Sequence, residues 1–514
     1  MPEIISIEPK IEFRPVPPST SAEAVAAART CYSPDIIDSL DVTEGQISRI
    51  GKQTFDSGHH TVFLHKMLSF DIVASRNVFH LLHYHPFYNS SQSSQRYVVF
   101  RYPEVIIPPD IVGNARNLFE SILKEIWEVY HEITKDLIPI IKNNYPGKRK
   151  IEDKSAEKLA IETARYILPI GAKSTAIHSI QLMTLLRLYR LAGGGGWGWE
   201  LQNILNQAVE KLKIREPDLI EYIPEPLSPE NSPESKFASN NGIDLLLSNE
   251  KSRRKFKEKM GYFSSKLTDW NANLTSSLNQ ATELVSGFSE NNFQISLDPI
   301  KNTHLIDQLH TDWLAPVSRI LTQGWVSFLK RVSHTANAQD QRHRTISSLT
   351  PMSELSETFH PDYITPELIK FDPHINTKYE KIMKKVYEIK AELIEEYRVP
   401  VSSALYLTPN AHSLYVQQSG SLLGYRHKWI LRSCWRSQRE IWGISMQEIE
   451  QVVNKWKELK PYLGPPCYVR YLPDIQQDIE REKRIWVKPK CTEGKMFCDI
   501  PVWLKFNTKM SRLI

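Results

Sequence analysis

The segment Gln341-Arg342-His343-Arg344 puts cations, an amide and an imidazole side by side in a 514-residue chain. An arginine fork binds phosphate or carboxylate through two parallel hydrogen bonds, and a neighbouring histidine can donate or stack. The segment follows an apolar run from Trp313 to Val332 and a polar stretch from Ser333 to Asp340. Taken alone, it indicates either an anion or cofactor clamp or a solvated, charged helix end.

A second polar stretch lies far upstream. Residues 58–65 read Gly-His-His-Thr-Val-Phe-Leu-His, and residues 94–97 read Ser-Gln-Arg-Tyr. Together with the first segment they resemble the flavin-dependent thymidylate synthases, the ThyX family. That family carries Gly-His-x-Thr-x-Phe-x-His, then Arg-His-Arg-x-x-Ser-x-Asn-Glu-x-Ser-x-Arg-Tyr. The upstream copy keeps the Ser-x-Arg-Tyr end but has Tyr84-His85-Pro86 in place of Arg-His-Arg, and the downstream copy keeps only Arg342-His343-Arg344. The signature is therefore divided between two places.

Two further family elements follow the same division. Residues 163–169, Thr-Ala-Arg-Tyr-Ile-Leu-Pro, resemble the family's Ala-Arg-x-x-Leu-Pro element. The family also has a nucleotide-facing arginine eight residues before a glutamate, a spacing that Arg432 and Glu440 keep. The first copy has Ala192 at that place. The resemblance thus implies two ThyX-like units in tandem, each lacking part of the motif.

The resemblance implies transfer of a methylene group from 5,10-methylenetetrahydrofolate to C5 of dUMP, reduction by FAD and recharging by NADPH. The residues expected at the flavin are Gln341, Arg342, His343, Arg344, Thr61 and His65. The residues expected at the nucleotide are Ser94, Gln95, Arg96, Tyr97, Arg165 and Arg432, the last of which is also the expected catalytic residue. An arginine over the pyrimidine stabilises negative charge on the ring oxygens, so no cysteine nucleophile is required.

Several alternatives remain open from the residues. A degenerate tandem is also consistent with a catalytically silent nucleotide- or flavin-binding protein, or with methylation of UMP or another uracil-bearing metabolite. The basic and aromatic run from Tyr425 to Trp442 has the ingredients of an RNA-binding surface, although a nucleotide pocket explains it as well. His80, His83 and His85 lack an acidic or cysteine companion, so no metal site is expected.

Composition favours a small anionic substrate. The net charge is +5 and the pI about 8.7, too weakly basic to favour nucleic acid as a partner. No apolar run of about twenty residues predicts a membrane span. Five irregularly spaced cysteines are typical of reduced thiols in a cytoplasmic protein.

In the family, sites form between subunits of a homotetramer, so we expect a homodimer of this chain to mimic that tetramer.

The resemblance implies an α+β fold of two tandem ThyX-like units, with a mixed sheet and long helices. We expect a first unit at 1–214, a Pro/Ser-rich linker at 215–245 and a second unit at 246–514. The pattern predicts helices over 21–30, 114–142, 249–286, 304–331 and 378–398, mostly helix over 154–188, and strands over 66–74, 468–471 and 502–506.

Overall fold

The computed structural model describes residues 18–147, 150–193, 198–242, 250–287, 313–351, 360–469 and 497–514. Packing divides the chain into two compact units. The smaller unit comprises Met1–Ile72, Phe87–Ser91 and Ala176–Asn240, and the larger unit comprises Val73–Pro86, Gln92–Thr175 and Asn241–Ile514. This division differs from the expected sequential one, because residues 92–175 pack with the second half of the chain. The boundaries expected from the sequence describe the two repeats, and they remain a prediction.

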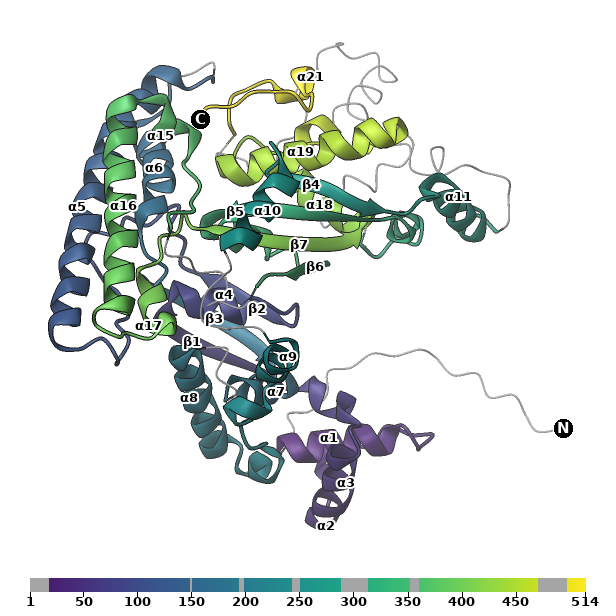
Figure 1. Cartoon of the computed structure of the whole chain (residues 1–514). Helices are drawn as coiled ribbons and strands as arrows, with labels where there is room; N and C mark the ends of the chain where they lie inside the picture. Colours follow the sequence, from purple (N-terminus) through teal and green to yellow (C-terminus); the bar gives the residue numbers. More distant parts are fainter. Residues whose placement is uncertain are drawn as a thin grey trace. The chain divides into compact units, whose positions relative to one another are not determined.

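The smaller unit is mainly helical (Figure 1). Its elements are α1 (Thr20–Thr30), η1 (Ser39–Asp41), α2 (Glu44–Gln46), η2 (Ile47–Gly51), α3 (Lys52–Asp56), η3 (His60–His65), α7 (Leu182–Ala192), α8 (Trp199–Arg215), η5 (Pro217–Tyr222), η6 (Pro229–Asn231) and most of α9 (Pro233–Asn241). A three-stranded sheet in the order β1-β3-β2 is formed by β1 (Met67–Ser75), β3 (Lys173–Gln181) and β2 (Tyr88–Gln92). The boundary between the two units crosses these strands.

The larger unit combines long helices with a four-stranded sheet in the order β4-β5-β7-β6. Its strands are β4 (Ser265–Trp270), β5 (Trp325–Ser333), β6 (Ile346–Leu349) and β7 (Ser413–Ser421). Its helices are α4 (Arg76–Leu82), α5 (Gly113–Asn144), α6 (Asp153–Ala164), η4 (Arg165–Ile167), α10 (Glu250–Met260), α11 (Leu274–Val285), η9 (Ser318–Gln323), α13 (His334–Asp340), α15 (Glu367–Phe371), α16 (Pro373–Glu395), α17 (Val401–Ala404), η10 (Leu405–Leu407), α18 (Leu422–Arg432), α19 (Arg439–Lys455), η11 (Lys457–Tyr462) and α21 (Val502–Lys505).

The α+β class is confirmed, with one difference in the sheet. All three strand pairs of the four-stranded sheet are antiparallel, whereas a mixed sheet was expected. Its central strands β5 and β7 pair over nine residues, from Trp325 opposite Ser421 to Ser333 opposite Ser413.

The two halves of the chain repeat the same order of elements. β3, α7, α8 and η5 begin at Lys173, Leu182, Trp199 and Pro217, and β7, α18, α19 and η11 begin 240 residues later at Ser413, Leu422, Arg439 and Lys457. Likewise η3, β1, α4 and β2 begin at His60, Met67, Arg76 and Tyr88, and η9, β5, α13 and β6 begin 258 residues later at Ser318, Trp325, His334 and Ile346. Because offset and element type recur together, the chain is a tandem repeat.

The two Leu-Pro elements meet inside the larger unit. Pro169 and Pro409 form an antiparallel bridge. The Ile170 amide donates to the Thr408 carbonyl and the Asn410 amide to the Leu168 carbonyl, both at 2.8 Å. Residues 240 positions apart thereby face one another, as expected where two copies of a motif pair about a local twofold axis.

Long helices support the larger unit. α5 and α16 lie side by side (Figure 1). Lys378 of α16 pairs with Asp136 of α5 at 2.9 Å, and Lys385 pairs with Glu125. Both helices bury one apolar stripe, which explains why periodicity predicted them well.

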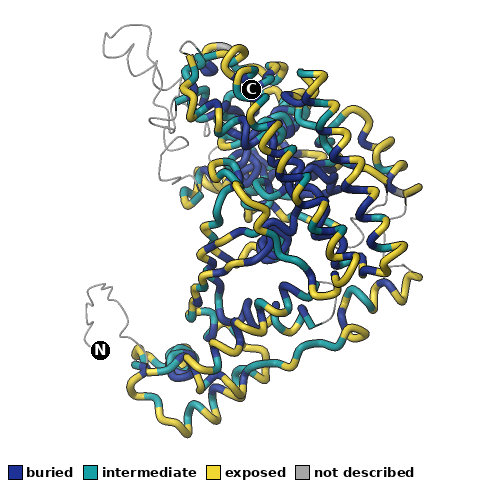
Figure 2. The backbone as a smooth tube through the Cα atoms, turned by 90° about the vertical axis from the view of Figure 1, so that its left-hand side faces the viewer, coloured by how far each residue is buried: buried dark blue, intermediate teal, exposed yellow. Residues whose placement is uncertain are grey.

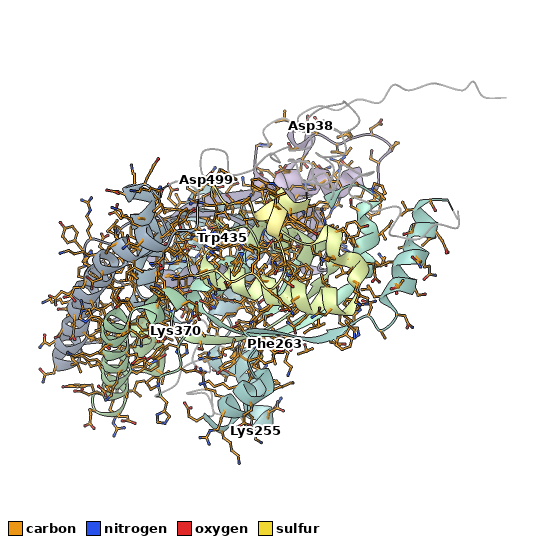
Figure 3. The ribbon with its side chains drawn as sticks, turned by 90° about the horizontal axis from the view of Figure 1, so that it is seen from above. Asp38, Lys255, Phe263, Lys370, Trp435 and Asp499 are labelled. Atoms are coloured by element: carbon orange, nitrogen blue, oxygen red, sulfur yellow. The ribbon has the colours of Figure 1, made fainter. Side chains whose placement is uncertain are left out.

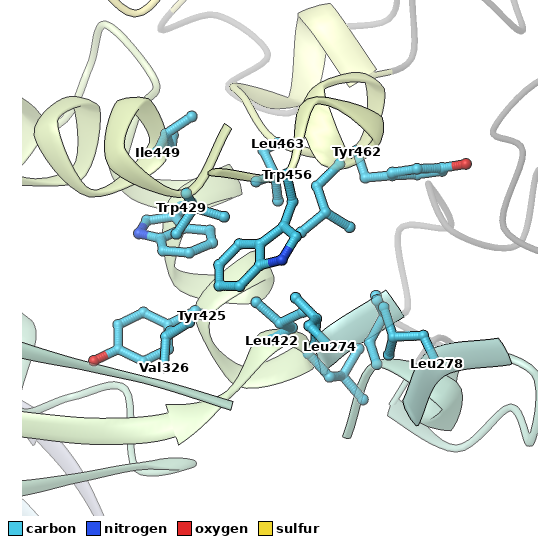
Figure 4. Close-up of a cluster of buried hydrophobic side chains, with 14 of the residues drawn as sticks. Leu274, Leu278, Val326, Leu422, Tyr425, Trp429, Ile449, Trp456, Tyr462 and Leu463 are labelled. Carbon is cyan, nitrogen blue, oxygen red and sulfur yellow. The ribbon is translucent and has the colours of Figure 1, made fainter. Parts of the chain in front are cut away.

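The largest apolar cluster that we describe packs between the four-stranded sheet and α11, α18 and α19 (Figure 4). It is built on Val326, Leu422, Tyr425, Trp429 and Ile449. Figure 2 colours buried stretches of the backbone dark blue. The cluster fixes α18, and therefore the direction in which its last residue, Arg432, leaves the helix.

Three secondary-structure predictions are wrong. Residues 173–181, expected to be helical, form β3, whose alternating buried positions are Ser174, Ala176, His178 and Ile180, too polar to show a period of two. Residues 325–333 form β5, which is buried on both faces and so resembles a buried helix in sequence. Residues 265–270 form β4 within the expected helix 249–286.

The structure also differs from the expected secondary structure near the C-terminal end and in the linker. Residues 502–505 form helix α21 where a strand was expected. Residues 217–222, 229–231 and 233–241 of the expected linker are short helices. The predictions over 304–312 and 470–471 lie outside the described residues.

Candidate functional site

Arg76, the first residue of α4, joins both halves of the chain within the larger unit. Its Nη1 donates to Gln95 Oε1 at 2.9 Å and also to Asn410 Oδ1, and its Nη2 donates to the His334 carbonyl at 2.9 Å. Asn410 Nδ2 donates in turn to Gln95 Oε1 at 3.1 Å and to the Arg165 carbonyl at 3.0 Å. All five residues are buried. The network therefore fixes Gln95 and Arg165, two expected nucleotide residues, against the second repeat.

A second connection between the repeats passes through Glu440. Its Oε1 accepts the Ser333 amide at 2.8 Å, and its Oε2 accepts the Ser333 hydroxyl at 2.6 Å and the Tyr166 hydroxyl. Burial raises the pKa of Glu440, and these donors oppose the rise. Since Glu440 has these donors, we assign it a role in holding α19 against Tyr166.

Arg432 is hydrogen-bonded to His343. Its Nε donates to His343 Nε2 at 2.9 Å, and its Nη2 donates to the Gln339 carbonyl at 3.2 Å. An Nε2 that accepts this bond carries no proton, so the imidazole is neutral. Burial lowers the pKa of His343 well below its ordinary value, and the Arg432 charge lowers it further. His343 therefore orients the arginine without competing with its charge.

Arg432 remains a cation despite its burial. Burial lowers its pKa to about 10, Asp340 opposes this, and the positive charges of Arg96 and Arg342 add to the lowering. The expected residues Arg96, Arg342 and Arg432 are thus close enough to act on one another electrostatically. A cluster of cations favours the binding of an anion.

Arg96 extends this cationic cluster into the first repeat. Its Nε pairs with Glu162, and its Nη2 donates to the Arg436 carbonyl at 2.9 Å. Its amide donates to Ser94 Oγ at 3.2 Å, and its guanidinium lies 5.3 Å from the centre of the exposed Tyr97 ring. Of the other residues of Ser94–Tyr97, Gln95 is buried, and Ser94 and Tyr97 contact Arg96.

Arg165 is buried beside the same cluster. Burial lowers its pKa, Glu162 opposes this, and the charge of Arg96 adds to it. Its Nε donates to the Glu162 carbonyl at 3.2 Å, whereas its Nη2 has no hydrogen-bond partner among the described residues. Gln95 Nε2 is likewise buried without a partner in the described structure. Two unsatisfied donors beside a cationic cluster fit an oxygen-rich ligand.

The expected flavin residues of the second repeat separate. His343 lies under Arg432, as described above. Gln341 and Arg344 line a pocket of roughly 150 Å³ with His80, His83, Tyr84, His85, Pro86, Asn337, Ile346, Ser347, Ser348 and Thr350. Asn337 Oδ1 is buried there and accepts no hydrogen bond from the described residues. The pocket thus brings the upstream histidines together with Gln341 and Arg344 of the downstream segment.

The pocket offers groups that suit part of a flavin. Guanidinium, amide and imidazole groups match the carbonyls and ring nitrogens of an isoalloxazine edge, and the unpartnered Asn337 Oδ1 matches an N–H. Burial lowers the pKa of both His80 and His85 to about 4, so both are neutral at physiological pH. Within the described residues no group of three or more His, Cys, Asp or Glu side chains is arranged to hold a metal ion.

Thr61 and His65, the remaining expected flavin residues, belong to the smaller unit. Both lie on η3, and both are exposed. Thr61 and His65 remain predictions.

A larger pocket of roughly 470 Å³ lies along α6 and the start of α19. It is lined by Glu162, Tyr166, Arg331, Glu367, Lys370, Gln438, Arg439, Glu440 and Arg512, among others. A smaller space of roughly 20 Å³ adjoins it at Glu162 and Arg512 and includes Arg96, Tyr97, Lys158 and Arg436. The volume of the larger pocket falls in the range of small-molecule sites.

The structure excludes one alternative for the run from Tyr425 to Trp442. Tyr425, Arg426, Lys428 and Trp429 are at most 1% exposed. A surface that stacks single-stranded bases needs exposed rings and cations. These four residues are core, so this segment is not an RNA-binding surface.

Three site residues escaped the sequence analysis. Asn410 follows Pro409 of the second Leu-Pro element, but its role depends on pairing with the first element. Glu162 lies one turn before Tyr166, and only its contact with Arg96 reveals it. Arg512 lies outside every recognised motif.

Comparisons with known proteins agree with the geometry. The Thy1 family model, described as thymidylate synthase complementing protein, matches residues 16–218 and 272–456. A flavin-dependent thymidylate synthase from Clostridium tetani is 28% identical over 218 residues, which cover 41% of this chain and 86% of that protein. One from Geobacter sulfurreducens is 27% identical over 205 residues, covering 38% and 78%.

A solved structure of the UMP/dUMP methylase PolB from Streptomyces cacaoi, bound with 5-Br dUMP, is also similar. It is 17% identical, covers 39% of this chain and 89% of its own, and has a TM-score of 0.30, too low to support a structural argument.

No helix among the described residues is long and apolar enough to cross a membrane. The family model matches two successive segments that make up most of the chain, and the same elements recur at constant offsets in both. The chain therefore belongs to the Thy1 family, the flavin-dependent thymidylate synthases (ThyX), as a divergent form with two family units in tandem.

Proposed function

We propose that the chain methylates C5 of a uridine nucleotide, dUMP in the first place, at one site built from both repeats. The observation that carries this proposal is the cationic cluster of Arg96, Arg165 and Arg432 inside one compact unit. Each repeat lacks one part of the family motif, and the cluster combines the parts that remain. A nucleotide monophosphate supplies the negative charge that such a cluster lacks.

The proposed roles follow from the contacts. Arg96 and Arg165, with Ser94, Gln95 and Tyr97, bind phosphate and ribose through charge-assisted hydrogen bonds. Arg432, held by His343 Nε2 at 2.9 Å, lies over the pyrimidine and stabilises negative charge on its oxygens. This stabilisation makes C5 more nucleophilic, and no protein nucleophile is involved.

FAD, 5,10-methylenetetrahydrofolate and NADPH complete the proposal. When bound, reduced flavin supplies the hydride that converts the transferred methylene into a methyl group. Gln341 and Arg344, which line the pocket of roughly 150 Å³, would bind the flavin edge, with Arg342 as a further proposed contact. Thr61 and His65 of the smaller unit are proposed separately as flavin-binding residues. The protein contributes binding, orientation and electrostatics.

A catalytically silent binding protein is the second candidate, and one observation favours it. The Arg96 fork is already engaged by Glu162 and by the Arg436 carbonyl. Such engagement weakens its grip on a phosphate unless the nucleotide displaces Glu162. UMP remains an alternative substrate, because no described contact selects the 2′ position.

The test is turnover of the purified full chain. We expect the protein to bind FAD and, with methylenetetrahydrofolate and NADPH, to convert dUMP into dTMP. Binding of FAD and dUMP without product would support the silent form. A preference for UMP under the same conditions would replace dUMP as the substrate. We further propose a homodimer in the cytoplasm, which light scattering of the purified chain and localisation of a tagged copy would test.

A further inference from the structure

Residues 497–514 lie beyond both segments that the family model matches. They pack on the start of α19 and on the loop before it. Cys498 and Val502 join Trp435, Trp442 and Met446 in one apolar cluster. Figure 3 labels Trp435, one of the residues of this cluster. Burial of this cluster anchors the segment on the side of α19 that also carries Arg439.

Arg512 is a buried charged residue of this segment. It is 5% exposed, and its guanidinium carbon lies 5.4 Å from the Trp435 ring and 5.6 Å from the Trp442 ring. Its Nε donates to the Ile514 carbonyl at 2.8 Å, and its own carbonyl accepts from Arg439 Nε. Two tryptophan rings and the hydrogen bond from Nε orient the guanidinium, and the hydrogen bond from Arg439 fixes the Arg512 backbone.

One arm of that guanidinium is unsatisfied. Arg512 Nη1 is buried and has no hydrogen-bond partner among the described residues. A charged donor buried without an acceptor costs more than a neutral one. Burial lowers the pKa of Arg512 to about 10, Glu162 opposes this, and the charges of Arg439 and Arg96 add to it, so Arg512 is still a cation at neutral pH.

The same residue lines two adjoining spaces. Arg512 and Glu162 border both the pocket of roughly 470 Å³ and the space of roughly 20 Å³. The smaller space is lined by four cations, Arg96, Lys158, Arg436 and Arg512, and Glu162 is the only acidic side chain among the described lining residues. The charge of this lining favours a small anionic group with several acceptor oxygens, and the adjoining pocket of roughly 470 Å³ has the volume to hold it.

We propose that Arg512 is an anion-binding residue of the nucleotide site and takes a phosphate group. The assignment of that phosphate to a nucleotide rests on the proposed function. A segment outside the family's matched region thus supplies an additional arginine, which compensates for the engagement of Arg96 by Glu162. Inorganic phosphate and dUMP both carry phosphate oxygens that can accept hydrogen bonds from Arg512, so binding of either ligand tests the role of this residue.

The experiment is calorimetric titration of the full chain and of its Arg512→Gln variant with dUMP, deoxyuridine and inorganic phosphate. Gln keeps length and a hydrogen-bond donor but loses the charge. We expect dUMP to bind about tenfold more weakly to the variant or worse, phosphate binding to disappear, and deoxyuridine binding to be unchanged. Arg116→Gln, an exposed arginine paired with Glu120 on α5, serves as the matched control.

The outcomes separate the two proposals. Tight dUMP binding that is equal in both proteins overturns the role of Arg512 and leaves the function standing. Arg512-dependent phosphate binding without any affinity for dUMP or UMP supports the anion site and refutes the uridine substrate. If the variant does not fold, hydrogen exchange of the wild-type chain decides: protection of residues 497–514 by dUMP or phosphate supports the role, and unchanged exchange with saturating ligand overturns it.

Discussion

The proposed site residues come from distant parts of the sequence, and specific hydrogen bonds hold them in place. His343 is the clearest case, because motif resemblance assigned it to flavin, whereas the structure puts its Nε2 under Arg432. A histidine that accepts from an arginine constrains that arginine's direction. The same imidazole therefore links the Arg-His-Arg segment to the residue proposed to face the pyrimidine.

Replacing His343 by Ala should impair the chemical step more than nucleotide binding. The change removes the acceptor for Arg432 Nε, so the guanidinium loses its fixed direction, and kcat should fall by about tenfold to a hundredfold. His343→Gln, which offers an acceptor oxygen, should recover part of the loss. Steady-state kinetics measure both, with His374→Ala, an exposed histidine at the start of α16, as control. Equal kcat in the Ala variant would show that Arg432 needs no such support.

Replacing Glu162 by Gln should strengthen phosphate binding and weaken the fold. The carboxylate pairs with Arg96, and the two side chains are only 8% and 16% exposed. Neutralising it frees the guanidinium for a ligand, while loss of a buried pair costs roughly 3 kcal/mol. Phosphate titration and urea unfolding measure the two effects. Weaker phosphate binding by a folded variant would mean that Glu162 itself positions the ligand.

At the scale of elements, helices with one apolar stripe were predictable, and two strands were not. α5 and α16 followed their periodicity. β3, whose buried side carries polar residues, and β5, which is buried on both faces, were expected as helices. The site was partly predictable, since motif residues Arg96, Arg165 and Arg432 do gather within the larger unit. The pairing of Asn410 with Arg76 and the contribution of Arg512 depend on tertiary contacts that no local pattern encodes.

A buried group of four charges holds β5, α13, α18 and α19 together. Lys330 pairs with Asp340 at 2.8 Å and with Glu448 at 2.7 Å, and Lys428 pairs with the same two acids at 2.8 and 3.0 Å. All four side chains are at most 1% exposed. Their mutual attraction keeps the pKa of Asp340 below and that of Lys330 above the ordinary value. Lys428 lies one turn before Arg432, so the group also fixes the end of α18.

Lys330→Met should destabilise the chain strongly. It leaves two carboxylates facing one lysine in the core, and removing one partner of such a pair costs about 3–5 kcal/mol. Urea unfolding measures the loss. The control Lys384→Met breaks an exposed pair with Glu388 on α16 and should change stability by less than about 0.5 kcal/mol. Equal effects of the two substitutions would contradict the structural role of the buried group.

At the scale of the molecule, two diverged repeats contribute complementary residues to the proposed nucleotide site. Family members with a complete motif in each unit need no such division, whereas here the first unit has Ala192 in place of Arg432 and the second lacks the Ser-x-Arg-Tyr end. The larger unit, which takes residues 92–175 from the first repeat, joins the complementary parts. Duplication followed by opposite losses explains this arrangement.

Acid should destabilise the larger unit. Burial holds the pKa of His80 at about 4 and those of His334 and His343 well below the ordinary value of 6.5. The unfolded chain then binds more protons than the folded one below about pH 6.5, so the free energy of unfolding falls with pH from there downwards. Thermal unfolding between pH 8 and pH 4.5 measures the fall. In His334→Gln the slope should be shallower, and an unchanged slope would show that this histidine is not neutral in the folded state.

We propose that each chain holds one nucleotide site made of both repeats. Calorimetric titration of the flavin-loaded chain with dUMP tests this proposal through the number of nucleotides bound. We expect one dUMP per chain in the wild-type protein, and binding too weak to measure in both Arg96→Ala and Arg432→Ala, whose folds circular dichroism verifies. Two nucleotides per chain, or wild-type affinity in either variant, would contradict it.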